Sequence, residues 1–119
     1  MDENLDIDKL LKTCIVLLEY SREKTLSART IQSAFRIVYV NDNENLKKGI
    51  MTGTKYVTEY VSNENTKINT FNHYKNVLRN FLQNDARELT TNEYRLGSNS
   101  IPYFCGIADT LNNQIQQFN

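Results

Sequence analysis

Apolar residues recur along most of the chain at spacings of three and four, the pattern of amphipathic helices that bury one face. The first such segment runs from Leu5 to about Glu23, and acidic residues crowd its start, where negative charge favours a helix N-terminus. Its predicted buried face consists of Ile7, Leu10, Leu11, Cys14, Ile15 and Leu18.

Two further helices are predicted before the middle of the chain. Ser27 is a good N-cap for a shorter second helix, and the polar turn "VNDNEN" separates it from a third. Gly49 and Gly53 lie four residues apart in the third helix, which predicts close packing against a neighbouring helix. The predicted inward positions are Ile31, Ala34, Phe35 and Val38 in the second helix, and Leu46, Ile50, Gly53, Val57, Tyr60 and Val61 in the third.

The segment "SNENTKINT" predicts a linker, after which Thr70 is expected to cap a fourth helix. A turn-rich segment with one short helical turn then leads to Ser100 and Pro102, which together mark the start of a fifth helix. The predicted inward positions are Phe71, Tyr74, Val77, Leu78, Phe81 and Leu82 in the fourth helix, and Phe104, Ile107, Ala108, Leu111, Ile115 and Phe118 in the fifth. No strand-like alternation persists, so the predicted fold class is all-α.

Charge changes this picture in two opposite ways. The 119 residues fit one compact domain, in which fourteen basic residues balance fourteen acidic ones. A freestanding DNA-binding protein usually has a basic excess, because phosphate neutralisation supplies most of its non-specific affinity. Zero net charge therefore argues against nucleic acid. Residues 22–36, however, hold four basic residues and one acidic residue, a local balance of +3.

No residue pattern supports catalysis or a metal site, so we expect no enzymatic activity, cofactor or metal. His73 is the only histidine, and Cys14 and Cys105 stand far apart, so the usual ligands of zinc are not grouped. The two cysteines are predicted to be reduced core residues. No apolar run reaches the roughly 20 residues that span a membrane, and the acidic start "MDENLDID" lacks the charge of a signal peptide. A soluble, intracellular protein is expected.

The candidate chemistry lies in the cluster of Arg22, Lys24, Thr25 and Arg29, at the junction of the first two predicted helices. A helix N-terminus offers backbone N–H groups and a partial positive charge to an anion. A lysine and a threonine hydroxyl beside those groups suit a phosphate oxygen. Such a cluster is also commonplace on the surfaces of soluble proteins, and taken alone it favours an ordinary solvated surface over phosphate binding.

The run "DIDKLLKTCIVLLEYSREKTLSARTIQSAFRIVY", Asp6 to Tyr39, resembles the core histones of the 2B type, from within the long central helix to the third helix. The best matching pieces are Tyr20, the "KT" of the loop, and "SARTIQSAFR". The segment "LKKGIMTGTKYVTEYVS" is similar to the C-terminal helix peculiar to that type, without a gap over its matching residues. The connecting loop is about three residues longer than in the family.

The second half resembles histone 2A more weakly. "RLGSNSIPYFCGIADTLNNQI", Arg95 to Ile115, looks like that family's first loop and the beginning of its long helix. The helix from Phe71 to Gln83 would take the place of the first histone helix. We therefore divide the chain into a 2B-like part, residues 1–64, and a partial 2A-like part, residues 65–119, within one compact domain. The order of the two parts is similar to the fused histone doublets of some large DNA viruses, and the chain would be a shortened version.

The resemblance implies a histone fold, in which long helices cross in a handshake and paired loops hold the DNA backbone without reading bases. By matching position, Arg22, Lys24 and Thr25 would form one phosphate-contacting loop and Arg95 would approach DNA from another. Arg29 belongs to the same set of candidate DNA-binding residues. The resemblance further implies double-stranded DNA and other histone-fold proteins, or a second copy, as partners, in a virion, a nucleus or a viral factory.

Several positions depart from the family. Glu23 stands at a basic position, the Lys-rich N-terminal tail is missing from this sequence, and the acidic patch of the nucleosome face keeps Asp109 but has Gln114 in place of a glutamate. Two hypotheses follow. The first is a histone-like protein that packages DNA within a histone dimer or nucleosome-like particle. The second is a histone-fold subunit of a transcription or scaffold complex that binds proteins and not DNA.

Overall fold

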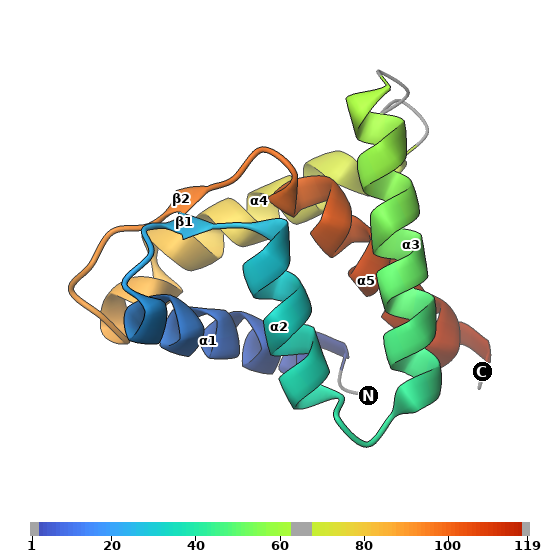
Figure 1. The fold of residues 1–119 in the computed structure, drawn as a ribbon, viewed down its shortest axis with the longest axis horizontal. Coiled ribbons are helices and arrows are strands. Elements are labelled where there is room, and N and C mark those ends of the chain that lie inside the picture. The colour runs from blue at the N-terminus through green and yellow to red at the C-terminus, as the bar shows by residue number, and fades with distance from the viewer. Residues whose placement is uncertain (1–2, 63–67, 118–119) are drawn as a thin grey trace.

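The computed structural model describes residues 3–62 and 68–117, with side chains described for residues 6–62 and 68–112. Within these ranges helices dominate, so the all-α prediction is confirmed, and the strands are two residues long (Figure 1). The elements in chain order are α1 (Glu3–Ser21), β1 (Thr25–Leu26), α2 (Ala28–Val38), α3 (Asn43–Val61), α4 (Phe71–Gln83), the short 3-10 helix η2 (Asp85–Glu88), β2 (Arg95–Leu96) and α5 (Ser100–Gln117).

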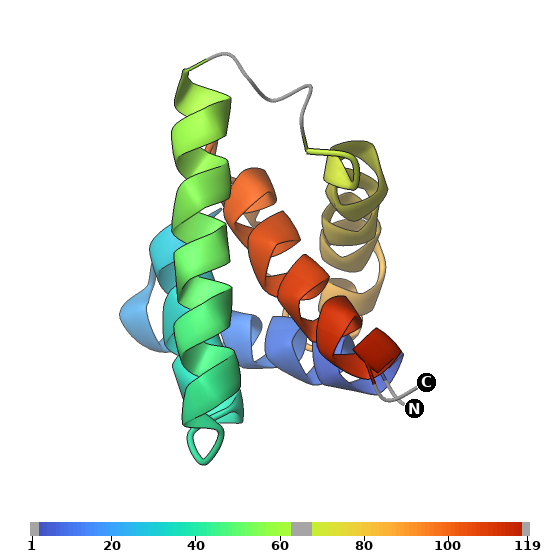
Figure 2. The same ribbon diagram turned by 90° about the vertical axis from the view of Figure 1, so that its right-hand side faces the viewer.

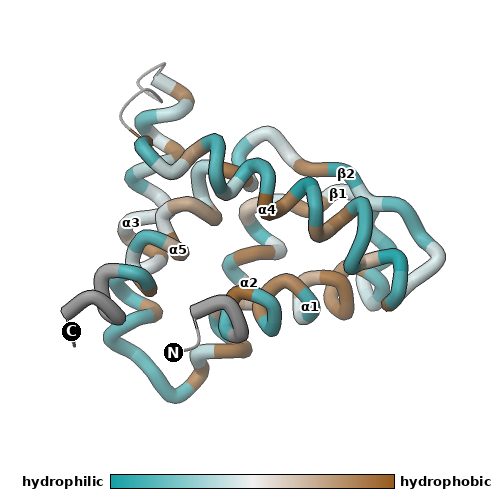
Figure 3. Tube along the Cα trace, turned by 180° about the vertical axis from the view of Figure 1, so that it is seen from behind, coloured by the Kyte–Doolittle hydropathy of each residue, from teal (hydrophilic) through white to brown (hydrophobic). Residues whose placement is uncertain are grey.

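The first two helices form as the sequence predicts. All six predicted inward residues of α1 are buried, and hydrophobic positions alternate with hydrophilic ones along this helix and α4 (Figure 3). The Ser27 hydroxyl accepts a hydrogen bond from the Thr30 N–H at 3.2 Å, which confirms Ser27 as the N-cap of α2. Of the predicted inward residues of α2, Val38 is half-buried and the others are fully buried.

Helix α3 begins earlier than predicted, at Asn43, because Asp42 caps it: its carboxylate accepts from the Asn45 N–H at 3.2 Å. The prediction that Val61 faces inward is wrong, since its side chain is 65% exposed. Figure 1 shows that the last turn of α3 projects past the rest of the molecule; Val61 faces solvent there, whereas the neighbouring Tyr60 contacts Phe71 of α4.

Thr70 stands at the N-cap position of α4, as predicted, but its side chain caps nothing. Its hydroxyl donates instead to the carboxylate of Asp109 on α5, at 3.1 and 3.2 Å from the two oxygens. The short helical turn expected in the following segment is η2. On the inner face of α4, Tyr74, Leu78 and Phe81 are buried.

Helix α5 is the centre of the core, since it contacts each of the four other α-helices of the described chain. Phe104, Ile107, Ala108 and Leu111 are buried, whereas Leu5, Ile115 and Phe118 lie outside the described side chains. The handshake that the resemblance implies would cross the apolar stripes of the long helices α1 and α5. They do share the core, but the most extensive partner of α5 is α3, which runs beside it (Figure 2).

Glycines bring α3 and α5 together. A Cβ atom added to Gly106 of α5 would lie 2.4 Å from the Cα of Gly53, and one added to Gly53 would lie 2.9 Å from the ring of Tyr103. The predicted close packing at Gly49 and Gly53 is therefore confirmed: Gly49 faces the ring of Phe35, and a Cβ there would come within 2.6 Å of it. Any larger side chain at the Gly53–Gly106 crossing would push the two helices apart.

The two parts of the chain meet within one molecule. Helix α3 of the first part packs on α5 of the second, and β1 pairs with β2. The linker residues 63–67 and the expected boundary between residues 64 and 65 lie outside the described residues. No helix in the described ranges has the length and apolar character needed to cross a membrane.

Candidate nucleic-acid interface

The pairing of β1 with β2 joins two loops that are far apart in the sequence. The strands are parallel, with Thr25 opposite Arg95 and Leu26 opposite Leu96. The Arg95 N–H donates to the Lys24 carbonyl at 2.9 Å, and the Gly97 N–H donates to the Leu26 carbonyl at 2.8 Å. The two loops are therefore held edge to edge (Figure 1).

Strand alternation decides which of these side chains faces solvent. Leu26 is fully buried and anchors β1 in the core, whereas the paired residues Thr25 and Arg95 are both exposed. Successive residues of a strand point to opposite faces, so burial of Leu26 turns the Thr25–Arg95 pair outward. Leu26 is a core residue that the sequence reading placed in a break between helices.

Lys24 joins this pair from the same loop. Its ammonium lies over the ring of Tyr94, 5.9 Å from the ring centroid, the geometry of a cation–π contact. Tyr94 directly precedes Arg95, so this contact also draws the two loops together. In the described chain, neither Lys24 nor Arg95 takes part in an ion pair.

Arg22 occupies a backbone conformation that is costly for a non-glycine residue. Its φ is 62°, in the left-handed region, directly after the end of α1. The following Glu23 N–H donates to the Leu18 carbonyl at 3.1 Å, so the helix ends in a Schellman motif, where glycine is the usual residue. An arginine here places an exposed cation in the β1 loop at the expense of backbone strain.

Arg29 is placed differently from the other candidate residues. It is exposed on the first turn of α2 and lines a small groove of about 210 Å³ together with Glu23 and Tyr20. The N-terminus of α2 also offers fewer free N–H groups to an anion than expected, because the Thr30 N–H already donates to the Ser27 hydroxyl. The structure thus brings Lys24, Thr25 and Arg95 together, with Arg22 in the same loop and Arg29 beside an acidic residue.

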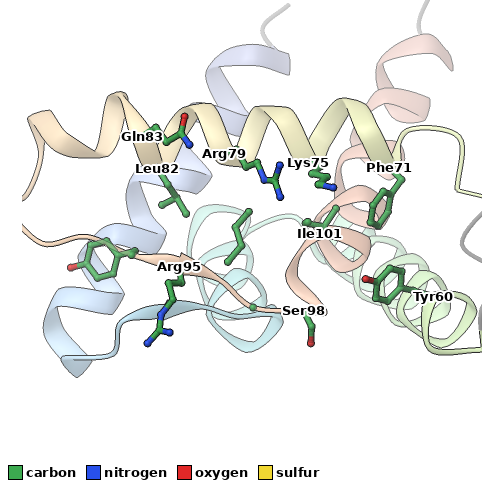
Figure 4. A pocket seen from close by; sticks show the side chains of 12 residues that line it. Tyr60, Phe71, Lys75, Arg79, Leu82, Gln83, Arg95, Ser98 and Ile101 are labelled. Atoms are coloured by element: carbon green, nitrogen blue, oxygen red, sulfur yellow. The ribbon is translucent and has the colours of Figure 1, made fainter.

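Sequence reasoning missed Lys75 and Arg79 on α4. Both line a groove of about 590 Å³ between α4 and the segment that runs from β2 into α5 (Figure 4). Their spacing of four from Phe71 places all three on one face of the helix, a signal that was present in the sequence. The apolar residues Tyr74, Leu78 and Phe81 dominate the pattern of α4 and conceal this second face.

Asp109 does not serve as the surface carboxylate that the family resemblance implied. It is half-buried and accepts from the Tyr56 hydroxyl at 2.7 Å as well as from Thr70. Burial, and the neighbouring Asp109 carboxylate, raise the pKa of Tyr56, which therefore remains a hydrogen-bond donor. The carboxylate ties α3, the start of α4 and α5 together.

The two cysteines and the histidine show no sign of a reactive site in the described part of the chain. Cys14 and Cys105 are free and buried, as predicted, and burial raises the pKa of each thiol to about 12, which keeps both protonated at neutral pH. His73 is exposed and packs edge-on against the ring of Tyr74. In the described part of the chain no group of His, Cys, Asp or Glu could hold a metal ion.

Comparison with protein-family models, with curated proteins and with solved structures finds no match to this chain.

Proposed function

We propose that this protein is histone-like and packages double-stranded DNA by holding its phosphate backbone with the paired loops. The observation that carries the proposal is the parallel pairing of Thr25–Leu26 with Arg95–Leu96. The resemblance to the histones implies that a loop of the 2B-like part pairs with a loop of the 2A-like part to contact DNA. The pairing of Thr25–Leu26 with Arg95–Leu96 supports this interpretation.

The electrostatics of the paired loops support phosphate binding. Arg22, Lys24 and Arg95 are exposed, and none of them is neutralised by an ion pair in the described chain. Thr25 is paired with Arg95 in the register of the two strands, and its hydroxyl can donate to a phosphate oxygen. Such contacts position a protein on the duplex without reading its sequence, so we expect binding to be independent of base composition.

Packaging by this chain requires partners, because its zero net charge supplies no general attraction to DNA. Val16 and Tyr20 lie four residues apart on α1 and are 65% and 90% exposed. This apolar surface beside the loops would join another histone-fold protein or a second copy. The 2B-then-2A order of the parts is that of viral histone doublets, so we place the assembly in a virion, nucleus or viral factory.

A histone-fold subunit that binds proteins and not DNA is the second candidate. The same exposed Val16 and Tyr20 and the zero net charge favour it. The two functions differ in one measurable respect, since only the packaging protein binds duplex DNA through the paired loops.

The deciding experiment is a titration of the purified chain with a duplex of random sequence, between about 50 and 200 mM salt. Three or four phosphate contacts predict that the logarithm of affinity falls against the logarithm of salt with a slope of about −3. The Lys24→Glu, Arg95→Glu double variant should bind the duplex at least tenfold more weakly. The slope of its logarithm of affinity against the logarithm of salt should be shallower by about two.

A charge-matched control separates the loops from net charge. Lys12 and Lys48 lie on the surface, in ion pairs with Asp8 and Glu44, and away from the paired strands in sequence. The Lys12→Glu, Lys48→Glu variant carries the same charge change and should keep most of the affinity. Equal losses in both variants would contradict a loop site. An absence of duplex binding at the lowest salt would discard DNA binding by the isolated chain and favour the interaction subunit.

A further inference from the structure

A groove lies on the other side of β2, and of the loop residues Arg22, Lys24, Thr25 and Arg95 only Arg95 also lines it. Its walls are α4 and the segment from β2 into α5, and Tyr60 in the last part of α3 closes one end (Figure 4). Its volume of about 590 Å³ falls within the usual range of small-molecule pockets, roughly 300 to 1,000 Å³.

One part of the groove is cationic. Lys75 and Arg79 project from α4 toward the opposite wall, whereas the side chain of Arg95 is directed away from α4 (Figure 4). No carboxylate lines the groove, and neither Lys75 nor Arg79 forms an ion pair in the described chain. Two cations one helical turn apart, facing a groove without an acidic partner, favour an anionic ligand group.

The other part of the groove is aromatic. The rings of Tyr60 and Phe71 are stacked, with centroids 5.5 Å apart and planes 15° from parallel, and both side chains are only half-buried. Ile101 and Leu82 add further apolar surface to the groove. A stacked, partly exposed ring pair is a surface on which a flat ring of a ligand can lie.

The two halves together select a ligand class. A free phosphate would use the cations and leave the rings uncovered, and an apolar molecule would leave the cations without a counter-charge. A nucleotide supplies both a phosphate and a flat base. Phe71, Lys75 and Arg79 follow one another at intervals of four residues along α4. Each of these positions therefore lies about 6 Å further along the helix axis than the one before it.

We propose that this groove binds a nucleotide whose base is unpaired, with the phosphate on Lys75 and Arg79 and the base against the Tyr60–Phe71 ring pair. Bases within a duplex are stacked on each other and cannot reach the rings, so the groove distinguishes a single strand from a duplex. The same chemistry is offered by a nucleotide within a single strand and by a free mononucleotide.

The test is a fluorescence-anisotropy titration of the full chain with a short labelled oligothymidylate, competed by unlabelled oligonucleotide, by a mononucleotide and by inorganic phosphate. Base stacking and one phosphate contact are each expected to contribute about five- to tenfold in affinity. Tyr60→Leu and Arg79→Gln should therefore each weaken single-strand binding by about that factor. Tyr60→Phe, which keeps the ring, should bind as the parent chain does.

Three results of the single-strand titration would each overturn the proposal. Unchanged affinity in Tyr60→Leu, with the helical circular dichroism signal intact, would remove the ring pair from the site. An equal loss in Lys12→Gln, which removes one charge from α1, would reduce the effect to net charge. If inorganic phosphate competed as strongly as the mononucleotide, the groove would bind phosphate only and would not recognise a base. A mononucleotide that competes as well as the oligonucleotide, and better than phosphate, supports the free nucleotide as the source.

The proposal for this groove can be tested separately from the proposal for the paired loops. Duplex affinity is expected to be unchanged in Tyr60→Leu, because the ring pair has no access to stacked bases. If Tyr60→Leu lowered duplex and single-strand affinity equally, the base-recognition part of the proposal would be wrong, while the loop proposal would remain open to its own charge variants.

Discussion

At the scale of single residues, the backbone conformation of Arg22 is unfavourable for a non-glycine residue, whereas its side chain suits a phosphate-binding loop. It holds a left-handed φ of 62° at the end of α1, where glycine would relieve the strain. Its side chain is exposed and contributes a cation to the loop that pairs with β2. A residue that is locally unfavourable and chemically suited to a site is the pattern expected where function opposes stability.

This conflict makes a prediction with two variants. Arg22→Gly should raise the free energy of unfolding by about 1 kcal/mol, because it removes the left-handed strain, and should weaken duplex binding several-fold. Arg22→Ala should weaken DNA binding to the same degree without the gain in stability. Urea unfolding and the duplex titration measure the two effects. A gain in stability from both variants would mean that strain is not the cause.

At the scale of secondary-structure elements, the Asp109 carboxylate joins three helices. It accepts hydrogen bonds from Tyr56 on α3 and from Thr70 at the start of α4, while itself belonging to α5. Because the hydroxyl of Thr70 serves this contact, it is not available to cap α4. The arrangement holds α4 in place beside the crossing of α3 and α5.

We expect Asp109→Ala to lower the free energy of unfolding by about 1 to 3 kcal/mol, because two half-buried hydroxyls lose their acceptor. Tyr56→Phe should cost about 1 kcal/mol, and the double variant should cost less than the sum, since both remove the same contact. The exposed Asp8→Ala, which breaks only a surface ion pair with Lys12, is the control and should change stability by less than about 1 kcal/mol. An unchanged stability in Asp109→Ala would return this residue to the role of a surface carboxylate.

At the scale of the whole molecule, the two parts of the chain, residues 1–64 and 65–119, share one core. The Cα radius of gyration is 13.6 Å, which matches the about 13.5 Å expected of a single compact domain of this length. Contacts of α3 with α5, and of β1 with β2, cross between the two parts. Neither part keeps its buried face covered without the other.

The shared core predicts a single unfolding transition. Leu10 on α1 and Leu78 on α4 are both fully buried and belong to different parts of the chain. Leu10→Ala and Leu78→Ala should each lower the free energy of unfolding by about 2 to 5 kcal/mol. In both variants tyrosine fluorescence and circular dichroism should report one coincident transition in urea. Two separated transitions, each sensitive to one variant only, would show two independent domains.

The sequence by itself determined the helices and most of their buried faces. The spacing of Leu10, Leu11 and Cys14, the cap at Ser27 and the start at Ser100 are local signals, because helix formation depends on residues within a few positions of each other. The glycine pair of α3 likewise predicted close packing against a neighbouring helix. The cations of the first loop were found for the same reason, since they are adjacent in the chain.

Only the tertiary structure decided which of these elements meet. The partner of Thr25 is Arg95, the neighbour of Gly53 is Gly106, and the acceptor for Tyr56 is Asp109; each pair is separated by a long stretch of sequence. The α4 groove is assembled in the same way from three separate segments. Such contacts depend on how the helices pack in three dimensions, and the hydrophobic effect that drives this packing is non-directional. A periodic pattern shows that a face is buried and carries no record of what covers it.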